Sequence, residues 1–385
     1  MIARRLFPKL QRSTKSILLL GPRQTGKSTL VAQLTPDLTV NLFHEPTYLE
    51  FARNPHELEE RLAALPANEE RQSIFIDEVQ RLPSLLNTVQ VVLDRPRNPY
   101  RFLLTGSSAR KLRRGQANLL PGRIHSYHLG PVAAAEVGYG LDTRQALATG
   151  TLPGILSEHD AEVRRKTLRS YAGTYLKEEI QAESLSRNLE GFARFISVVA
   201  ERAGHHLDLS KLAAAAQVAR QSATRYFEIL EDTLIVQRAE PFTRSANRRL
   251  VQHPKFYFFD VGVRNGLLGG FDVSGDRIGA LFEQLVFSQL AASAAAIDSN
   301  IRIASYRTAH GAEVDFIVEL ADRVWALELK ASRHVTTGDL RGLRAFAEYF
   351  GRKHTPLALY LGTERRRIEG IDVLPWQDGL RRMGL

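Results

Sequence analysis

Three short apolar runs near the N-terminus each end in a polar or glycine-rich segment. Residues 17–20 precede a glycine loop, residues 74–76 precede two carboxylates, and residues 102–104 precede Thr105 and Gly106. Parallel strands that are buried on both faces are apolar throughout, and stretches with helical spacing separate these three runs. The pattern therefore predicts an α/β domain with a parallel sheet over residues 1–150.

The middle of the chain, residues 151–272, has apolar residues at helical spacing followed by two short apolar runs. It predicts a helical connector, the two helices of a helix-turn-helix and two strands of a wing. In chain order these are residues 162–204, 208–216, 222–231, 234–237 and 255–259. Asp208 is a good N-cap for the first of the paired helices, and a turn near Val218 separates it from the second. We interpret this region as a helical and winged-helix-like segment.

The last part of the chain, residues 273–385, returns to an α/β pattern. Residues 279–296 predict a helix, and residues 302–306, 313–320 and 323–329 predict strands. The sequence thus predicts three regions, consistent with a length of 385 residues, which exceeds what one hydrophobic core usually serves.

The composition is that of a globular protein with a basic surface. Hydrophobic residues make up 44% and charged residues 24%, and the formal net charge is +10. The field of such a protein attracts polyanions such as nucleic acid. There is no cysteine, the first residues lack the apolar run of a signal peptide, and no stretch approaches the roughly 18 apolar residues of a membrane span. We therefore expect a cytoplasmic protein without a membrane partner.

The glycine loop after the first predicted strand carries a phosphate-binding pattern. The pattern G-x-x-x-x-G-K-[ST] is met by Gly21, Pro22, Arg23, Gln24, Thr25, Gly26, Lys27 and Ser28, with Thr29 next. In such a loop the backbone N–H groups surround the phosphates, Lys27 reaches the β and γ phosphates, and the Ser28 hydroxyl ligates Mg²⁺. The loop predicts ATP and Mg²⁺ as cofactors.

The second apolar strand ends in Asp77 and Glu78, which complement this loop. Asp77 is expected in the magnesium shell, and Glu78 is expected to activate the water that attacks the γ-phosphate. The alternative is that the pair caps a helix. Thr105, Ser107 and Ser108 follow the third strand, where they can contact the γ-phosphate or the water, or cap a turn.

Three blocks of sequence together resemble one family. They are GPRQTGKSTL, FIDEVQRLPSLLNTVQ and FLLTGSSARKLRRGQANLLPGRIHSYHLGPVAAAEV, and they are similar to the AAA+ family of prokaryotic ATPases with a C-terminal domain of unknown function related to PD-(D/E)xK nucleases. The resemblance implies a nucleotide sensor at Ser107 or Ser108 and a homo-oligomer, such as a hexameric ring. It also implies an arginine that acts on a neighbouring subunit's nucleotide: Arg123, with Arg113 and Arg114 as alternatives, unless these form a solvated basic face.

The C-terminal strands carry two carboxylates and a lysine. Glu328 and Lys330 share one strand face, and hairpin pairing can bring Asp315 beside them. This set matches the D…ExK core of PD-(D/E)xK nucleases, with Glu283 as a further ligand and Lys330 as a non-ligand, so it predicts a Mg²⁺ site. Val314 replaces the proline of the motif, which leaves cleavage open. The alternative is an ordinary cross-strand pair of Glu328 and Lys330.

Two functions of different classes follow. In the first, an oligomeric ATPase acts on DNA through the basic residues of the middle segment: Arg220, Gln221, Ser222, Thr224, Arg225, Arg244, Arg248, Arg249 and Lys255. In the second, a nucleotide-dependent switch binds a protein partner in a regulatory, toxin–antitoxin or defence system, and the nuclease-like domain is catalytically silent. The carboxylate pair and the length disfavour a small-molecule kinase.

Overall fold

The computed structural model describes residues 2–66, 68, 71–107, 120, 122–182, 189–242, 253–308 and 311–385, with side chains described outside residues 175–182. These residues form two compact units. The N-terminal unit comprises Ala3–Gly130 and Asp232–Leu234, and the C-terminal unit is made mainly of Pro131–Glu231 and Ile235–Leu385. Each unit has its own sheet and its own core.

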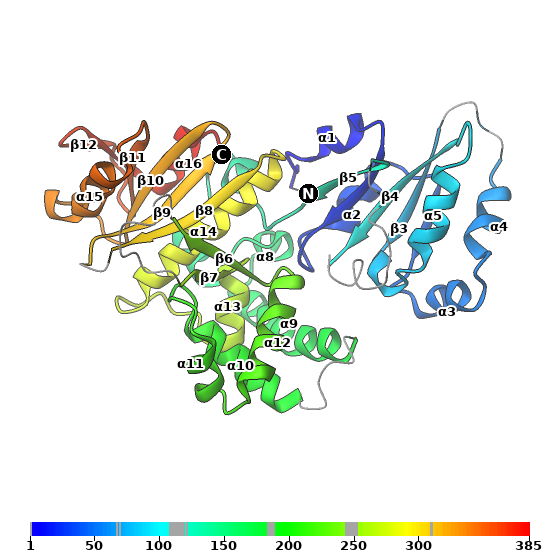
Figure 1. Ribbon diagram of the computed structural model, residues 1–385, viewed down its shortest axis with the longest axis horizontal. Helices are drawn as coiled ribbons and strands as arrows, with labels where there is room; N and C mark the ends of the chain where they lie inside the picture. Colours follow the sequence, from blue (N-terminus) through cyan, green and yellow to red (C-terminus); the bar gives the residue numbers. More distant parts are fainter. Residues whose placement is uncertain are drawn as a thin grey trace. The chain divides into compact units, whose positions relative to one another are not determined.

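The N-terminal unit is built on a five-stranded parallel sheet of order β2-β3-β4-β1-β5 (Figure 1). Its strands are β1 (Ser16–Leu20), β2 (Leu38–Asn41), β3 (Gln72–Asp77), β4 (Tyr100–Gly106) and β5 (Ile124–His128). The described helices are α1 (Phe7–Arg12), α2 (Lys27–Ala32), α3 (Glu45–Arg53), α4 (Glu57–Ala63) and α5 (Leu85–Leu93), with a 3₁₀ turn, η1 (Val79–Arg81).

The three strands predicted from apolar runs are the three central strands of this sheet. Every residue of β1 is buried, as expected for a parallel strand covered on both faces. Leu20 pairs with Gly106 across β1 and β4, so these strands end together at one edge of the sheet. The apolar pattern does not reveal β2 and β5, because each of these outer strands buries a single residue.

The N-terminal unit ends at Gly130, earlier than the boundary near residue 150 that the sequence predicts. The segment after it, with η2 (Ala134–Val137) and α7 (Thr143–Thr149), belongs to the C-terminal unit. It contributes Ala134, Leu141 and Leu147 to a core that also contains residues of the C-terminal sheet. A helical stretch that packs on a distant part of the chain cannot be assigned to a domain from local periodicity.

The C-terminal unit contains the predicted helical region. Its helices before the sheet are α8 (Pro153–Ser157), α9 (Ala161–Ala182), α10 (Leu189–Glu201), α11 (Leu209–Ala215) and α12 (Arg220–Asp232). Asp208 caps α11 as predicted, since its carboxylate accepts hydrogen bonds from the N–H groups of Ser210 and Lys211, both at 3.1 Å. The turn falls at Gln217, which has a φ of 53°, and α12 begins before Ser222.

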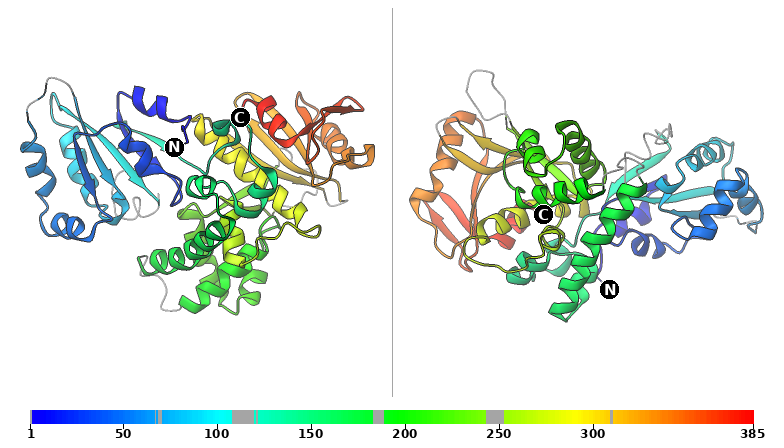
Figure 2. Two further views of the ribbon diagram at one scale, coloured as in Figure 1. Left: turned by 180° about the vertical axis from the view of Figure 1, so that it is seen from behind. Right: turned by 90° about the horizontal axis from the view of Figure 1, so that it is seen from below.

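The C-terminal sheet has eight strands in the order β12-β13-β11-β10-β9-β8-β6-β7 (Figure 2). They are β6 (Val236–Pro241), β7 (Lys255–Phe258), β8 (Ile301–Arg307), β9 (Glu313–Leu320), β10 (Arg323–Lys330), β11 (Thr355–Tyr360), β12 (Arg366–Ile368) and β13 (Ile371–Pro375). The two strands predicted in the middle segment form the antiparallel pair β6–β7. It is not free-standing, because β6 continues the sheet beside β8, where Glu240 pairs with Ala304.

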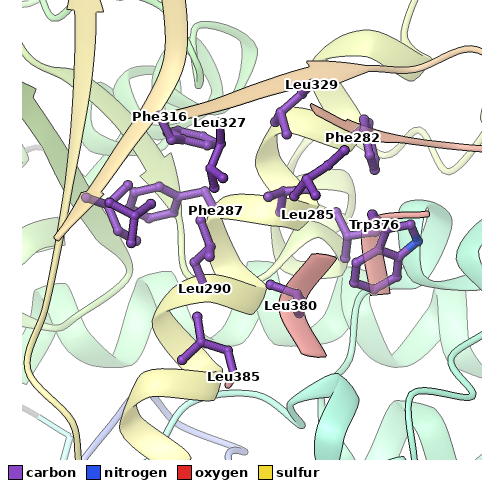
Figure 3. Packing of buried hydrophobic residues seen from close by; sticks show 14 of the residues in the cluster. Phe282, Leu285, Phe287, Leu290, Phe316, Leu327, Leu329, Trp376, Leu380 and Leu385 are labelled. Carbon is purple, nitrogen blue, oxygen red and sulfur yellow. The ribbon is translucent and has the colours of Figure 1, made fainter. Parts of the chain in front are cut away.

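Helices cover both faces of this sheet. They are α13 (Val261–Leu268), α14 (Ile278–Ala296), the 3₁₀ turn η3 (Thr337–Leu340), α15 (Arg341–Phe350) and α16 (Trp376–Met383). Phe287 of α14 and Leu380 of α16 share one apolar core with Leu327, while Phe346 of α15 packs in another with Ala326 (Figure 3). Successive residues of β10 point to opposite faces, so α14 and α16 cover one face and α15 the other.

Helix α14 was predicted over residues 279–296, but it is long and apolar enough to cross a membrane by length and composition, contrary to the expectation that no stretch approaches a membrane span. In the structure 67% of that segment is buried within the protein. Its apolar residues, including Phe282 and Leu285, contact the C-terminal sheet and α16 (Figure 3). Its character is that of the central helix of a folded domain.

Candidate active site

The predicted phosphate-binding loop connects the carboxyl end of β1 to the first turn of α2. A side chain at position 21 would place its Cβ 2.2 Å from the carbonyl oxygen of Leu129, so the loop requires glycine there. Gly26 has a φ of 89°, in the left-handed region that glycine adopts without strain. These two glycines let the backbone curl tightly ahead of the helix N-terminus, which is the geometry that surrounds a phosphate with N–H groups.

Lys27 is buried within this loop, with 5% of its surface exposed. Its Nζ donates to the carbonyl oxygens of Gly21 at 2.9 Å and Pro22 at 3.0 Å. The ammonium group is thereby held inside the curl of the loop, where phosphates would lie.

Arg4 forms hydrogen bonds with the backbone of the loop and with Gly130, a role that the sequence did not predict. Its guanidinium donates to the carbonyl oxygen of Thr25 at 2.8 Å and to that of Gly130 at 2.9 Å. The arginine is 9% exposed. A basic residue before the first strand has no motif around it, so only the fold reveals this contact.

Ser28 and Asp77 meet at the carboxyl ends of the strands. The Ser28 hydroxyl donates to Asp77 Oδ1 at 2.9 Å, and Thr105 Oγ1 donates to the same oxygen. The parallel order β3-β4-β1 places these three residues at one edge of the sheet. A hydroxyl and a carboxylate oxygen are hard ligands of the kind that Mg²⁺ takes, so this corner fits the predicted cation.

Glu78 follows in a left-handed conformation, with a φ of 59°, and its N–H donates to Thr105 Oγ1 at 3.1 Å. Its Oε2 accepts from Gln80 Nε2 and from Ser107 Oγ, the latter at 3.4 Å, and Gln80 Nε2 also donates to Ser107 Oγ at 2.9 Å. The structure therefore brings together the predicted Glu78 and Ser107. It adds Gln80, whose only sequence signal is its position two residues after Glu78.

Arg123 lies at the opposite edge of the same sheet. It precedes Ile124, which pairs with Ser16 at the start of β1, whereas the phosphate-binding loop follows the end of β1. A strand of this length separates the two edges by roughly 16 Å, so Arg123 cannot serve the nucleotide of its own chain. Its Nε forms an ion pair with Asp94. Ser108, Arg113 and Arg114, as well as Arg244, Arg248 and Arg249, lie outside the described residues.

The predicted C-terminal constellation is arranged differently from a metal site. Asp315 accepts a hydrogen bond from the Leu329 N–H at 2.7 Å, and Glu328 Oε1 pairs with Lys330 Nζ at 2.9 Å. Glu283 accepts instead from Tyr257 OH at 2.6 Å. In the part of the chain that the structure describes, no group of three His, Cys, Asp or Glu residues is placed to hold one metal ion. The predicted Mg²⁺ site at Glu283, Asp315 and Glu328 is thus not assembled.

The physical reason is Lys255, which was expected among the nucleic-acid contacts of the wing. It is buried, with 6% exposure, and its Nζ lies 3.0 Å from Glu283 Oε1 and 3.0 Å from Glu313 Oε1. Because β7 lies at the edge of the C-terminal sheet, its lysine enters the acidic cluster and balances charge that a divalent cation would otherwise balance.

Two carboxylates of this cluster, Asp315 and Glu328, have pKa values above those of ordinary carboxyl groups. Burial, followed by the charges of Glu283 and Glu328, raises the pKa of Asp315 well above its usual value. Burial also raises the pKa of Glu328, although the Lys330 ammonium opposes the shift. One oxygen of Glu328, Oε2, is buried without a hydrogen-bond partner among the described residues.

Three family matches cover most of the chain. Residues 13–138 match the AAA domain, residues 140–274 match a domain of unknown function (DUF8612), and residues 278–378 match another (DUF4143). The N-terminal match contains Lys27, Ser28, Asp77 and Glu78, so the site described above is that of an AAA-type ATPase domain. The two matched domains of unknown function fall in the C-terminal unit.

Two relatives are similar over most of their length. The uncharacterized proteins Mb2031c of Mycobacterium bovis and Rv2008c of Mycobacterium tuberculosis are each 31% identical over 325 residues, which is 82% of this chain and 70% of theirs.

Two solved structures are also similar in part. One is a DNA polymerase III gamma subunit-related protein of Thermotoga maritima, with 9% identity and a TM-score of 0.27 over 59% of this chain and 97% of that chain. The other is a signal transduction ATPase with numerous domains and a tetratricopeptide repeat sensor from Pyrococcus horikoshii, with 12% identity and a TM-score of 0.23 over 76% and 45%. At these scores neither likeness establishes a shared architecture.

Proposed function

Because this chain belongs to the family of the mycobacterial proteins Mb2031c and Rv2008c and carries an AAA domain, we propose that it binds Mg²⁺-ATP at the loop before α2 and hydrolyses it with Glu78 as the base. The observation that carries this proposal is the convergence at one sheet edge. Lys27 lies within the loop, the Ser28 hydroxyl contacts Asp77, and Glu78 stands one residue further on.

The residues present fit ATP and Mg²⁺. The curled loop and Lys27 supply N–H and ammonium donors for phosphate oxygens, and Ser28 with Asp77 supplies oxygen ligands for the cation. When bound, Mg²⁺ neutralises charge on the phosphates. The protein's own part is to hold these donors in place before the nucleotide arrives, which lowers the cost of ordering them.

Glu78 can remove a proton from the attacking water if its carboxylate is aimed at it. Gln80 and Ser107 both bond Glu78 Oε2, which leaves Oε1 for the water. The three side chains form a small network, and Gln80 and Ser107 are positioning residues within it. Thr105 contributes by fixing the Glu78 backbone and the Asp77 carboxylate.

The proposal is tested with Glu78→Gln. The amide keeps the size of the side chain but cannot accept a proton, so turnover should fall by about 10²–10⁴-fold while the affinity for ATP stays within a factor of a few. Phosphate release measures the first quantity, and equilibrium binding of a fluorescent ATP analogue measures the second. The control is Glu50→Gln, an exposed carboxylate on α3 of the same unit. Wild-type turnover in Glu78→Gln would remove Glu78 from the reaction.

We also propose that Arg123 acts on the nucleotide of a neighbouring copy in a homo-oligomer. Its position at the far edge of the sheet from the loop supports action between subunits. Arg123→Ala should lower turnover and leave ATP affinity intact, because such an arginine stabilises charge that develops in the transition state.

The test is a mixture of Arg123→Ala with Lys27→Ala. Partial recovery of ATP turnover would support action in trans, since one interface then combines an intact loop with an intact arginine. No recovery in assemblies shown by mass measurement to be mixed would contradict it. The role of Arg123 would then be structural, through contacts that include the ion pair with Asp94.

We propose nucleic acid, in particular DNA, as the partner, on the support of a net charge of +10. The rival is a nucleotide-dependent switch that binds a protein. Stimulation of ATP turnover by duplex DNA separates the two, because a protein switch has no reason to respond to it.

A further inference from the structure

Two adjoining hollows of the C-terminal unit are lined by arginines. The larger, of about 680 Å³, is lined by Arg365, Arg366, Arg367, Arg381 and Arg382 together with Asp372 and Asp378. The smaller, of about 490 Å³, is lined by Arg323, Lys353 and again Arg382, with Asp322. We call these seven cations the C-terminal basic surface. They lie on β12, on the last turn of α16 and at the start of β10 and β11 (Figure 1).

Two carboxylates fix part of this surface. Asp378 accepts from Arg365 Nε at 2.9 Å and from Arg381 Nη1 at 2.9 Å, and Asp372 accepts from Arg367 Nε at 2.8 Å. Arg381 also lies over the Tyr139 ring, 4.4 Å from its centre. Each contact with a carboxylate uses one nitrogen of the guanidinium, and the Arg365, Arg367 and Arg381 side chains are still 66%, 67% and 51% exposed, so further N–H donors remain for a ligand.

Arg366 and Arg382 complete the surface without a carboxylate of their own. Both side chains are exposed, and neither makes a side-chain hydrogen bond or an ion pair among the described residues. Arginines gathered with too few carboxylates repel each other and destabilise the free protein. An anion with several charges would remove this repulsion and could accept paired hydrogen bonds from the planar guanidinium groups.

The form of the surface decides the class of anion. Because Arg382 lines both hollows, the cations continue from β12 to the start of β10 and β11, which suits a linear polyanion better than a single phosphate. The two aromatic residues that line the hollows offer little stacking surface, because Trp325 is 3% exposed and the His354 ring packs edge-on against Phe346 and Phe350. A surface without an accessible stacking platform matches a phosphate backbone and not unpaired bases.

We infer that the C-terminal basic surface binds the phosphate backbone of duplex nucleic acid without regard to sequence. The inference rests on the proposed nucleic-acid partner and gives it a location apart from the helix-turn-helix and from the buried Lys255. The nucleotide site is in the other unit, so occupation of this surface does not require Lys27 or Glu78.

The test is binding of the full-length protein to a fluorescent 30-base-pair duplex at several stated salt concentrations. Arg366→Ala/Arg382→Ala should weaken binding at least about tenfold. It should also lower the slope of log K against log salt by about 2, since two phosphate contacts are lost. Arg366→Lys/Arg382→Lys keeps the charge and should retain most of the slope.

The matched control is Arg165→Ala/Arg202→Ala, which removes the same charge from exposed positions of the same unit, one on α9 and one directly after α10. An equal loss in this control, or unchanged affinity and slope in the folded Arg366/Arg382 variant, would overturn the inference. Competition by poly-L-glutamate as strong as that by DNA would also overturn it and favour an acidic protein partner. Basal ATP turnover, measured in every variant, reports separately on the proposed ATPase and should not change.

Discussion

Lys27→Ala should abolish ATP binding and turnover in a protein that remains folded. The ammonium of Lys27 now bonds two loop carbonyls, and in the complex it would exchange them for phosphate oxygens. Hydrogen bonds to charged groups contribute about 1.5–3 kcal/mol each, so the loss of two corresponds to an affinity about 100-fold lower or more. Arg4 does not replace this ammonium, because its guanidinium is bound to the carbonyl oxygens of Thr25 and Gly130.

A matched control exists in the same unit. Lys15 also donates its Nζ to a backbone carbonyl, that of Gly122 at 2.8 Å, but it does so at the opposite edge of the sheet and is exposed. Lys15→Ala should bind and hydrolyse ATP as the wild type does. Equilibrium binding of labelled ATP and phosphate release are compared in the two variants, with thermal unfolding to show that both fold. Retention of wild-type affinity by Lys27→Ala would place the nucleotide elsewhere.

The nucleotide site was predictable from sequence because its residues are adjacent to the strands that position them. Lys27 and Ser28 begin the helix after β1, and Asp77 ends β3. In a parallel sheet the carboxyl ends of neighbouring strands meet, so knowing the strands is enough to bring these residues together. The sequence did not predict the roles of Gln80 and Arg4, because these roles depend on side-chain direction and on tertiary contacts. Neither produces a recognisable local pattern in the sequence.

The C-terminal cluster was harder to predict because its decisive residue is far away in the chain. The strands β9 and β10 and the helix α14 were predicted, and with them the neighbourhood of Asp315 and Glu328. The sequence also indicated the hairpin that carries Lys255. Periodicity does not show which sheet a hairpin joins. Lys255 was therefore predicted to be an exposed DNA contact, whereas in the structure it is paired with Glu283 and Glu313.

Lys255→Ala should cause the largest loss of stability of any substitution considered for this protein. It removes the cation from a cluster in which Lys255 is nearly fully buried and bonds two carboxylates. Removing one partner of a buried ion pair costs about 3–5 kcal/mol. The loss should lie toward the lower end here, because Glu283 and Glu313 are 21% and 33% exposed and Arg307 still pairs with Glu313 at 3.7 Å. The control, Lys211→Ala, breaks a pair between Lys211 and Asp208 in which the lysine side chain is 86% exposed, and should cost at most about 1 kcal/mol.

The pH dependence distinguishes this electrostatic cause from loss of packing. In the wild type burial acts to raise the pKa of Glu313, but the charge and hydrogen bond of Lys255, together with Arg307 and His206, lower it below its usual value. The carboxylate therefore stabilises the fold above its unfolded pKa, and this contribution is lost as pH falls through the folded pKa. Without Lys255, Arg307 and His206 are the weaker contributions that still oppose burial, so the pKa of Glu313 should rise above that of the unfolded chain. Its contribution then becomes destabilising as pH rises through that window. The difference in unfolding free energy between the wild type and Lys255→Ala should therefore shrink as the pH is lowered from 7 to 5, as measured by denaturant unfolding at each pH.

Adding Glu283→Gln to Lys255→Ala should recover part of the lost unfolding free energy at pH 7, because it removes one of the two carboxylate charges that Lys255 balances. A deficit that is equal at both pH values and unaffected by Glu283→Gln would mean that Lys255 contributes through its packed methylene chain, and that the acidic cluster does not depend on it for charge balance.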